Sequence, residues 1–166
     1  MKNSTEFYNQ KFVQDRIRER KLRIGEVIFK TNELQFKAGC LISFFILNKI
    51  DDKFVKEVTS NAYSNFKLVT DILRRFFTEK YPNRKADIFK LCENMDRLGE
   101  IRNKFAHEFL IIGNTSLSYF PSRARKHIPW GQEGEEVAKL FNEFEKLFKE
   151  VEEEVRSLLV GLGNDV

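Results

Sequence analysis

Proline and glycine are scarce in this chain, which has three prolines and eight glycines among its 166 residues. Proline interrupts helices and glycine favours turns, so their scarcity argues against a loop-rich β-protein and predicts long helices. Cysteine is scarcer still. Cys40 and Cys92 lie far apart inside apolar helical patterns, so we expect two buried free thiols, as is typical of a cytoplasmic protein.

Long hydrophobic runs are missing as well. The longest, residues 40–47, is far shorter than the roughly 20 residues that a membrane-spanning helix needs. Residues 1–5 lead into charged residues without an apolar signal core, so the sequence predicts no export and no membrane partner. The two histidines do not stand at metal-ligand spacing, and no glycine loop is present to cradle a phosphate. We therefore expect no metal and no other cofactor.

Basic residues are in slight excess, with a net charge of +4, and they are unevenly distributed. One group crowds the N-terminal segment and another lies near residue 125, whereas the last predicted helix is acidic. Such groups can hold the phosphates of RNA, but solvated helix faces produce the same pattern. Both interpretations stay open for the candidate RNA-binding residues, which are Arg18, Arg20, Arg123, Arg125 and Lys126.

Apolar residues recur at steps of three and four over most of the chain, which predicts amphipathic helices. The fold class is therefore all-α, an antiparallel bundle of four to five helices. We expect a charged, helical arm over residues 1–24, the bundle over 25–160 and a tail over 161–166. The predicted helices of the bundle cover residues 25–50, 53–80 (divided near residue 60), 86–112 and 135–160.

One long irregular stretch, residues 114–134, precedes the last helix. Leu117, Tyr119 and Ile128 fit either a long loop or a short β-hairpin there. Loops of this length inside compact domains are usually functional.

A polar group interrupts the apolar stripe of the third helix. After Leu98 the next position on that stripe is Arg102, whose guanidinium is costly to bury unless an anion or a partner surface meets it. On an α-helix Asn103 and His107 project from one side, a turn apart, with Arg102 rotated toward the stripe. Arginine can bind a phosphodiester, and histidine can move the proton of a ribose hydroxyl.

A structural interpretation of the same residues stays open. Arg102 could pair with Glu100, Asp96 or a glutamate of the last helix, and His107 could be hydrogen-bonded in the core. Arg102 and His107 would then form a clamp rather than an active site.

The run Leu98-Gly99-Glu100-Ile101-Arg102-Asn103-Lys104-Phe105-Ala106-His107 resembles the signature of the HEPN superfamily of small helical proteins. That signature is arginine, a polar residue that is often asparagine, three further residues and histidine. The resemblance implies a bundle of HEPN type and a metal-independent endoribonuclease, often in a toxin–antitoxin or phage-defence system. Arg102 and His107 would be catalytic, with Asn103 in support, at a cleft shared by the motif helices of a homodimer.

Two features of the family bear on function. HEPN toxins silenced by a nucleotidyltransferase antitoxin have a tyrosine two positions after the histidine, and this chain has Phe109 there. Control by an antitoxin of that kind is therefore doubtful, although another antitoxin or regulatory protein remains a candidate partner. Proteins resembling the mannitol operon repressor share the helical fold as regulators, so a non-catalytic regulator or adaptor is the alternative prediction.

Overall fold

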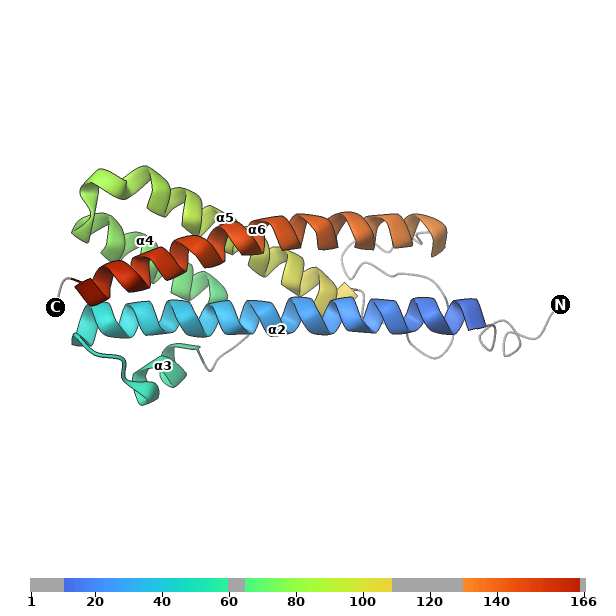
Figure 1. Ribbon diagram of the computed structural model, residues 1–166, viewed down its shortest axis with the longest axis horizontal. Helices are drawn as coiled ribbons and strands as arrows, with labels where there is room; N and C mark the ends of the chain where they lie inside the picture. The colour runs from blue at the N-terminus through green and yellow to red at the C-terminus, as the bar shows by residue number, and fades with distance from the viewer. Residues whose placement is uncertain (1–10, 60–64, 109–129, 165–166) are drawn as a thin grey trace.

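The computed structural model describes residues 11–59, 65–108 and 130–164, and all regular structure in these ranges is helical (Figure 1). The all-α class is therefore confirmed, whereas the loop or hairpin around Leu117, Tyr119 and Ile128 lies outside the described residues. The elements in chain order are α2 (Lys11–Leu47), α3 (Asp52–Thr59), α4 (Asn65–Lys80), the 3₁₀ helix η1 (Pro82–Arg84), α5 (Lys85–Asn103), the π-helix η2 (Lys104–Glu108) and α6 (Trp130–Asn164).

Helix boundaries differ from the prediction in two places. α2 begins at Lys11 and continues through Gly25, so most of the predicted arm and the first bundle helix form one element of 37 residues. α6 begins at Trp130, ahead of the predicted start at residue 135. The predicted division of the second region is confirmed, because α3 ends at Thr59 and α4 begins at Asn65.

The turn between α2 and α3 is held by side chains. Asp51 Oδ1 accepts a hydrogen bond from the backbone N–H of Phe54 (3.0 Å), and this bond lowers the pKa of the Asp51 carboxyl. Ser43 Oγ donates to the carbonyl of Lys49 (3.0 Å) and accepts from the N–H of Asp51 (2.9 Å). Asn48 adopts a left-handed φ of 54° between them. This local turn ends α2 and starts α3.

The two longest helices, α2 and α6, run in the same direction (Figure 1). Lys30 binds Glu145 (2.8 Å) and Lys37 binds Glu152 (2.7 Å), and both pairs are 115 residues apart. A constant separation requires parallel helices. The prediction of an antiparallel bundle is therefore wrong for this pair.

The pairs α4–α5 and α5–α6 are antiparallel, as predicted, so α4 runs parallel to α2, which it also contacts. Between α4 and α5, Thr70 contacts Asp96 whereas Arg74, one turn further along α4, lies over the earlier Phe89. Arg84, directly before α5, binds Glu154 of α6, and Arg97 of α5 binds the earlier Glu143. α5 thus runs against both of its neighbours.

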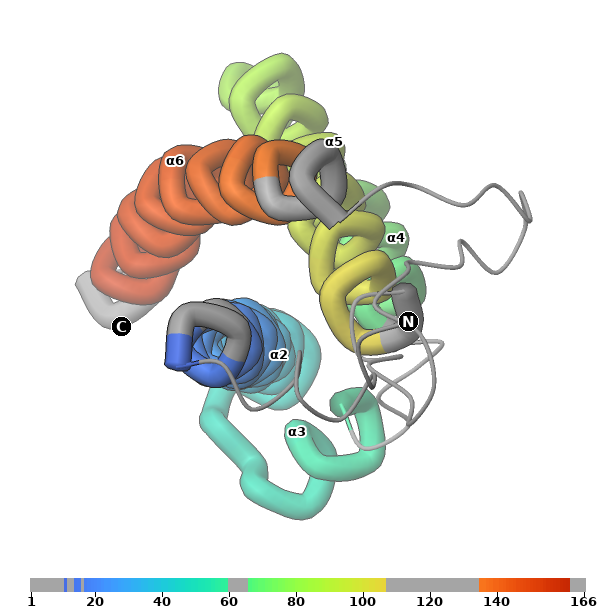
Figure 2. Tube along the Cα trace, turned by 90° about the vertical axis from the view of Figure 1, so that its right-hand side faces the viewer, coloured from blue at the N-terminus to red at the C-terminus, as the bar shows by residue number. Residues whose placement is uncertain are grey.

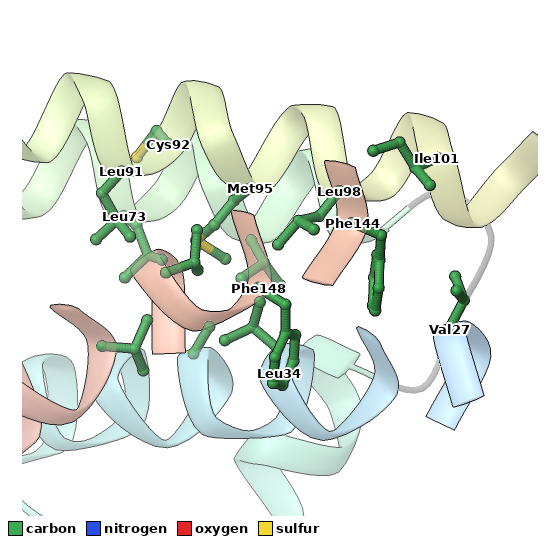
Figure 3. Close-up of a cluster of buried hydrophobic side chains, with 14 of the residues drawn as sticks. Val27, Leu34, Leu73, Leu91, Cys92, Met95, Leu98, Ile101, Phe144 and Phe148 are labelled. Atoms are coloured by element: carbon green, nitrogen blue, oxygen red, sulfur yellow. The ribbon is translucent and has the colours of Figure 1, made fainter. Parts of the chain in front are cut away.

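The core fills the space between α2, α4, α5 and α6 (Figures 2 and 3). Leu34 of α2, Met95 of α5 and Phe144 of α6 are fully buried there. The stripe predicted for the last helix is confirmed. Val137, Phe144, Phe148, Val151, Val155 and Leu158 are buried, and Phe141 packs against the cluster. No helix among the described residues has a stretch long and apolar enough to cross a membrane.

Candidate functional site

Arg102 is buried at the end of α5, with 8% of its surface exposed. Its chain neighbour Ile101 is fully buried. Arg102 is thus a charged side chain on the buried side of α5. Its Nη1 donates to Oδ1 of Asn103 (3.1 Å), and Asn103 is exposed. The guanidinium therefore reaches from the core to the surface, and the amide of Asn103 holds one of its nitrogens there.

The helix changes its winding directly after this pair. α5 ends at Asn103 and the backbone continues as the π-helix η2, Lys104–Glu108. In an α-helix, positions five apart differ in direction by about 140°. In a π-helix, hydrogen bonds join residues five apart, so such positions lie roughly one turn apart on the same side. The π-helix therefore moves position 107 toward the side of the helix that carries Arg102.

This geometry changes the predicted arrangement of the motif. The sequence prediction placed position 107 with Asn103 and away from Arg102, because it assumed α-helical winding throughout. The backbone at position 107 belongs to η2, whereas the side chain of His107 lies outside the described residues.

The N-terminal half of α2 lies beside the motif. Phe105 of η2 is fully buried and its ring contacts Phe141 of α6 (6.5 Å between centroids). The guanidinium of Arg23 stacks over the same Phe141 ring at 5.2 Å. Arg20 lies one turn before Arg23 and is half-buried. The fold thus brings basic residues of α2 to the end of the bundle where α5 becomes η2.

The candidate RNA-binding residues do not all share this location. Arg18 is exposed and lies two positions before Arg20, so it projects from roughly the opposite side of α2. Of Arg18 and Arg20, only Arg20 lies on the side of α2 that carries Arg23, near the motif. The predicted loop residues Arg123, Arg125 and Lys126 lie outside the described residues.

Carboxylates considered as partners of Arg102 have strong contacts elsewhere. Glu100 accepts from Arg97 (2.9 Å), and Glu143 of α6 binds Arg97 through both carboxylate oxygens (2.7 and 3.1 Å). The Arg97 guanidinium lowers the pKa of the Glu143 carboxyl. Arg97 therefore joins α5 to α6 through an ion pair.

No protein-family model, no curated protein and no solved structure matches this chain. The functional argument therefore rests on the residues of the site.

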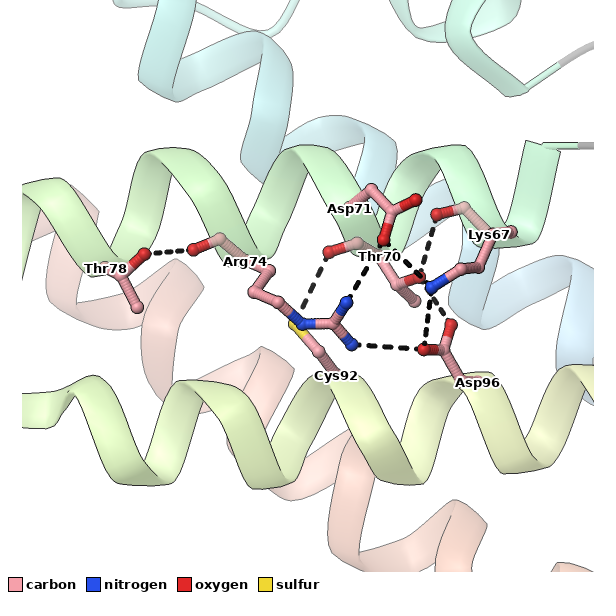
Figure 4. A network of polar contacts seen from close by, with 7 residues as sticks. All are labelled: Lys67, Thr70, Asp71, Arg74, Thr78, Cys92 and Asp96. Atoms are coloured by element: carbon pink, nitrogen blue, oxygen red, sulfur yellow. Dashed lines mark hydrogen bonds and ion pairs between the residues drawn. The ribbon is translucent and has the colours of Figure 1, made fainter.

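A second polar cluster joins α4 to α5 and was not predicted (Figure 4). Asp96 of α5 accepts hydrogen bonds from Thr70 (2.6 Å), Arg74 (3.1 Å) and Lys67 (3.3 Å) of α4. Burial by itself raises the pKa of the Asp96 carboxyl, but these three donors outweigh it and hold the pKa below its ordinary value. Asp71 also binds Lys67 and Arg74. Because each cation already has a carboxylate, the cluster connects two helices rather than offering a charged site to a ligand.

The neighbouring Cys92 is buried against this cluster. Its Sγ lies 3.5 Å from the carbonyl oxygen of Thr70, and burial raises the pKa of the thiol to about 11. Both Cys92 and Cys40 are free and buried, as the sequence predicts. A thiol protonated at neutral pH is a poor nucleophile. Within the ranges that the structure describes, no three histidine, cysteine or acidic side chains are grouped to hold a metal ion.

Proposed function

We propose that this protein is a metal-independent endoribonuclease of HEPN type, with Arg102, Asn103 and His107 as its catalytic group. The observation that carries the proposal is the π-helix that begins directly after Arg102 and Asn103. Single π-turns inside α-helices are rare and occur frequently at functional sites. Here the π-turn reduces the angular separation between the two positions that the chemistry needs together.

The proposed reaction is an internal transfer at phosphorus. His107 takes the proton from a ribose 2′-hydroxyl, and the 2′-oxygen attacks the adjacent phosphorus. The bond from phosphorus to the 5′-oxygen breaks, and that oxygen takes the proton held by His107. The products are a 2′,3′-cyclic phosphate and a 5′-hydroxyl end. Arg102 stabilises the negative charge on the equatorial phosphate oxygens, and Asn103 orients Arg102 through the observed hydrogen bond.

RNA would approach this group along the basic half of α2. Arg20 and Arg23 come from that half, and Arg23 shares Phe141 with Phe105 of η2. Phosphate contacts by arginine give affinity that depends on salt but little on sequence. A homodimer that pairs the motif helices would place two such groups in one cleft. An antitoxin of a toxin–antitoxin or phage-defence system would control its activity.

The alternative is a non-catalytic regulator or adaptor, and the burial of Arg102 favours it. An arginine with 8% of its surface exposed contributes to packing through its aliphatic stem as well as through its charge. Arg102 would then be a structural clamp at the end of α5, and the helices would serve to bind a partner.

Cleavage of a mixed tRNA and mRNA substrate in EDTA tests the proposal. Wild type is expected to leave cyclic-phosphate ends, and His107→Ala is expected to lose about 10²–10⁴-fold in rate, as for removal of a general base. His127→Ala is the matched control, because it removes the other histidine of the chain. Equal activity in both variants, or no cleavage by folded wild type, contradicts the proposal.

Arg102→Lys separates the catalytic role from the clamp. Lysine keeps the positive charge but lacks the planar fork that binds phosphate in bidentate fashion. The proposal predicts slow cleavage with a melting temperature close to that of wild type. A large fall in melting temperature in this variant supports the clamp instead.

A further inference from the structure

The outer side of α2 carries a row of exposed apolar side chains. Leu22, Phe29 and Phe36 are exposed by 66%, 69% and 49%, and they stand seven residues apart. The opposite side of the same helix provides Val27, Leu34 and Ala38 to the core. Seven-residue spacing keeps a row in line along a helix and is the repeat of coiled coils.

The parallel helix α6 shows that this row is unusual within the molecule. α6 is of similar length, and its outward side is polar, as expected for a helix that faces solvent. Its exposed residues include Lys139, Asn142, Lys146, Lys149, Glu150 and Glu153. α2 is therefore apolar on two opposite sides. One of them faces the core, and the other is exposed at Leu22, Phe29 and Phe36 and meets α3 further along the helix, at Gly39.

We propose that this outer face of α2, formed by Leu22, Gly25, Phe29, Asn32 and Phe36, packs against the same face of a second copy. The two helices would be parallel and in register. Leu22, Phe29 and Phe36 take the first position of successive heptads, and Gly25 and Asn32 take the fourth. A Cβ added at Gly25 would meet nothing within 4 Å, so a second helix can approach closely there.

The charges beside this face select the parallel orientation. One flank carries exposed Glu26 and Glu33, which also pair within α2 with Lys30 (2.8 Å) and Lys37 (2.9 Å), and the other flank carries exposed Lys21. In a parallel pair the two different flanks meet, so Lys21 lies near the partner copy's acidic flank. In an antiparallel pair each flank faces the same flank of the partner copy, so the two acidic flanks oppose each other. Charges at these flanking positions set the orientation of helix pairs.

The expected contact is small. The three apolar side chains expose on the order of 350 Å² per protomer, given roughly 150–250 Å² for a large aromatic side chain. A standard interface buries about 800 Å² per partner. We therefore expect a dimer that dissociates at micromolar concentrations. This face points away from α5, so the inference is independent of the proposed nuclease and its motif-helix dimer.

Sedimentation of the full chain over a concentration range tests the inference. Wild type is expected to associate, and Phe29→Glu is expected to weaken association by about tenfold or more, since each 1.4 kcal/mol is a factor of ten. Leu68→Glu is the control, because Leu68 is an exposed apolar residue on α4 (47%). Wild type that stays monomeric overturns the inference. So does a Phe29→Glu variant that melts earlier at unchanged mass, because the row is then covered within its own chain.

Cross-linking tests the orientation. Parallel, in-register helices bring the two copies of position 25 together, so Gly25→Cys is expected to form a disulfide-linked dimer under mild oxidation. Glu93→Cys on α5 is the control for random encounters, since position 93 is exposed on another helix. The native cysteines are buried and do not compete. Equal cross-linking of the two variants overturns the parallel arrangement.

Discussion

Two glycines of α2 have opposite surroundings. A Cβ at Gly39 would lie 2.7 Å from Cγ2 of Thr59 and 3.2 Å from Cγ1 of Val55, both on α3. Thr59 is held in place because its hydroxyl donates to the carbonyl of Val55 (2.7 Å). A Cβ at Gly25 meets nothing within 4 Å. Gly39 is thus required by packing within the monomer, whereas Gly25 has no packing role within the monomer and weakens the helix there.

Alanine at these two positions is expected to change stability in opposite directions. Gly25→Ala should stabilise the fold by about 0.5–1 kcal/mol through helix propensity. Gly39→Ala should be net destabilising, because overpacking costs about 1–3 kcal/mol and outweighs the same propensity gain. Urea denaturation at low protein concentration measures both. Stabilisation by Gly39→Ala contradicts the close α2–α3 contact.

At the scale of single elements, the contact between α4 and α5 depends on one carboxylate. Asp96 accepts from three side chains of α4, and these bonds hold its pKa below the ordinary value of 3.8. A depressed pKa in the folded state stabilises the fold above the unfolded pKa. That stabilisation is lost as the pH falls below about 4, when the carboxylate is protonated.

Asp96→Asn is therefore expected to lower the free energy of unfolding at pH 7 by about 1–3 kcal/mol, as for lost hydrogen bonds to a charged group. The difference from wild type should shrink as the pH falls below about 4, because protonation then removes the same charge from wild type. Denaturant titrations at pH 7 and pH 3 measure it. Glu93→Gln, at an exposed position of α5, should show neither effect. A pH-independent difference contradicts the role of the Asp96 charge.

The motif element illustrates the limit of a local pattern. Periodicity identified the stripe of α5 and the interruption at Arg102, because a buried helix face requires apolar residues at helical spacing. The same periodicity assumes 3.6 residues per turn. The change to a π-helix at Lys104 therefore lies outside that pattern, as does the contact of the buried Phe105 with the ring of Phe141. These two rings come from positions far apart in the chain, so the spacing of apolar residues within one helix cannot predict their contact.

At the scale of the whole molecule, the parallel pairing of α2 and α6 is the feature that organises the bundle. Parallel helix dipoles repel each other, and the ion pairs across this interface offset part of that repulsion. Lys30 and Lys37 each contact a glutamate of α6, and these bonds raise the pKa of the Lys37 ammonium.

Zero-length coupling with a carbodiimide is expected to link Lys30 to Glu145 and Lys37 to Glu152, because only a lysine in contact with a carboxylate forms the amide. Mass spectrometry of the digested protein identifies both links. Lys30→Arg is the control, since arginine keeps the ion pair but does not couple. A link between Lys30 and Glu152 instead indicates antiparallel helices.

The sequence by itself determined the helical class and the buried faces. These follow from a local property, namely the period of apolar residues. It also singled out Arg102, Asn103 and His107. It did not identify the Asp96 cluster as a contact between helices, although the spacing of Lys67, Asp71 and Arg74 suggests ion pairs along α4.

The tertiary structure alone decided which helices are neighbours, in which direction they run and which apolar residues stay outside. Leu34 and Phe36 are both apolar residues of α2, yet one is fully buried and the other half exposed. The hydrophobic effect is non-directional, so an apolar stripe predicts that one face of the helix is buried but does not predict which element buries it. Partner and direction depend on contacts between residues far apart in the chain, such as Lys30 and Glu145.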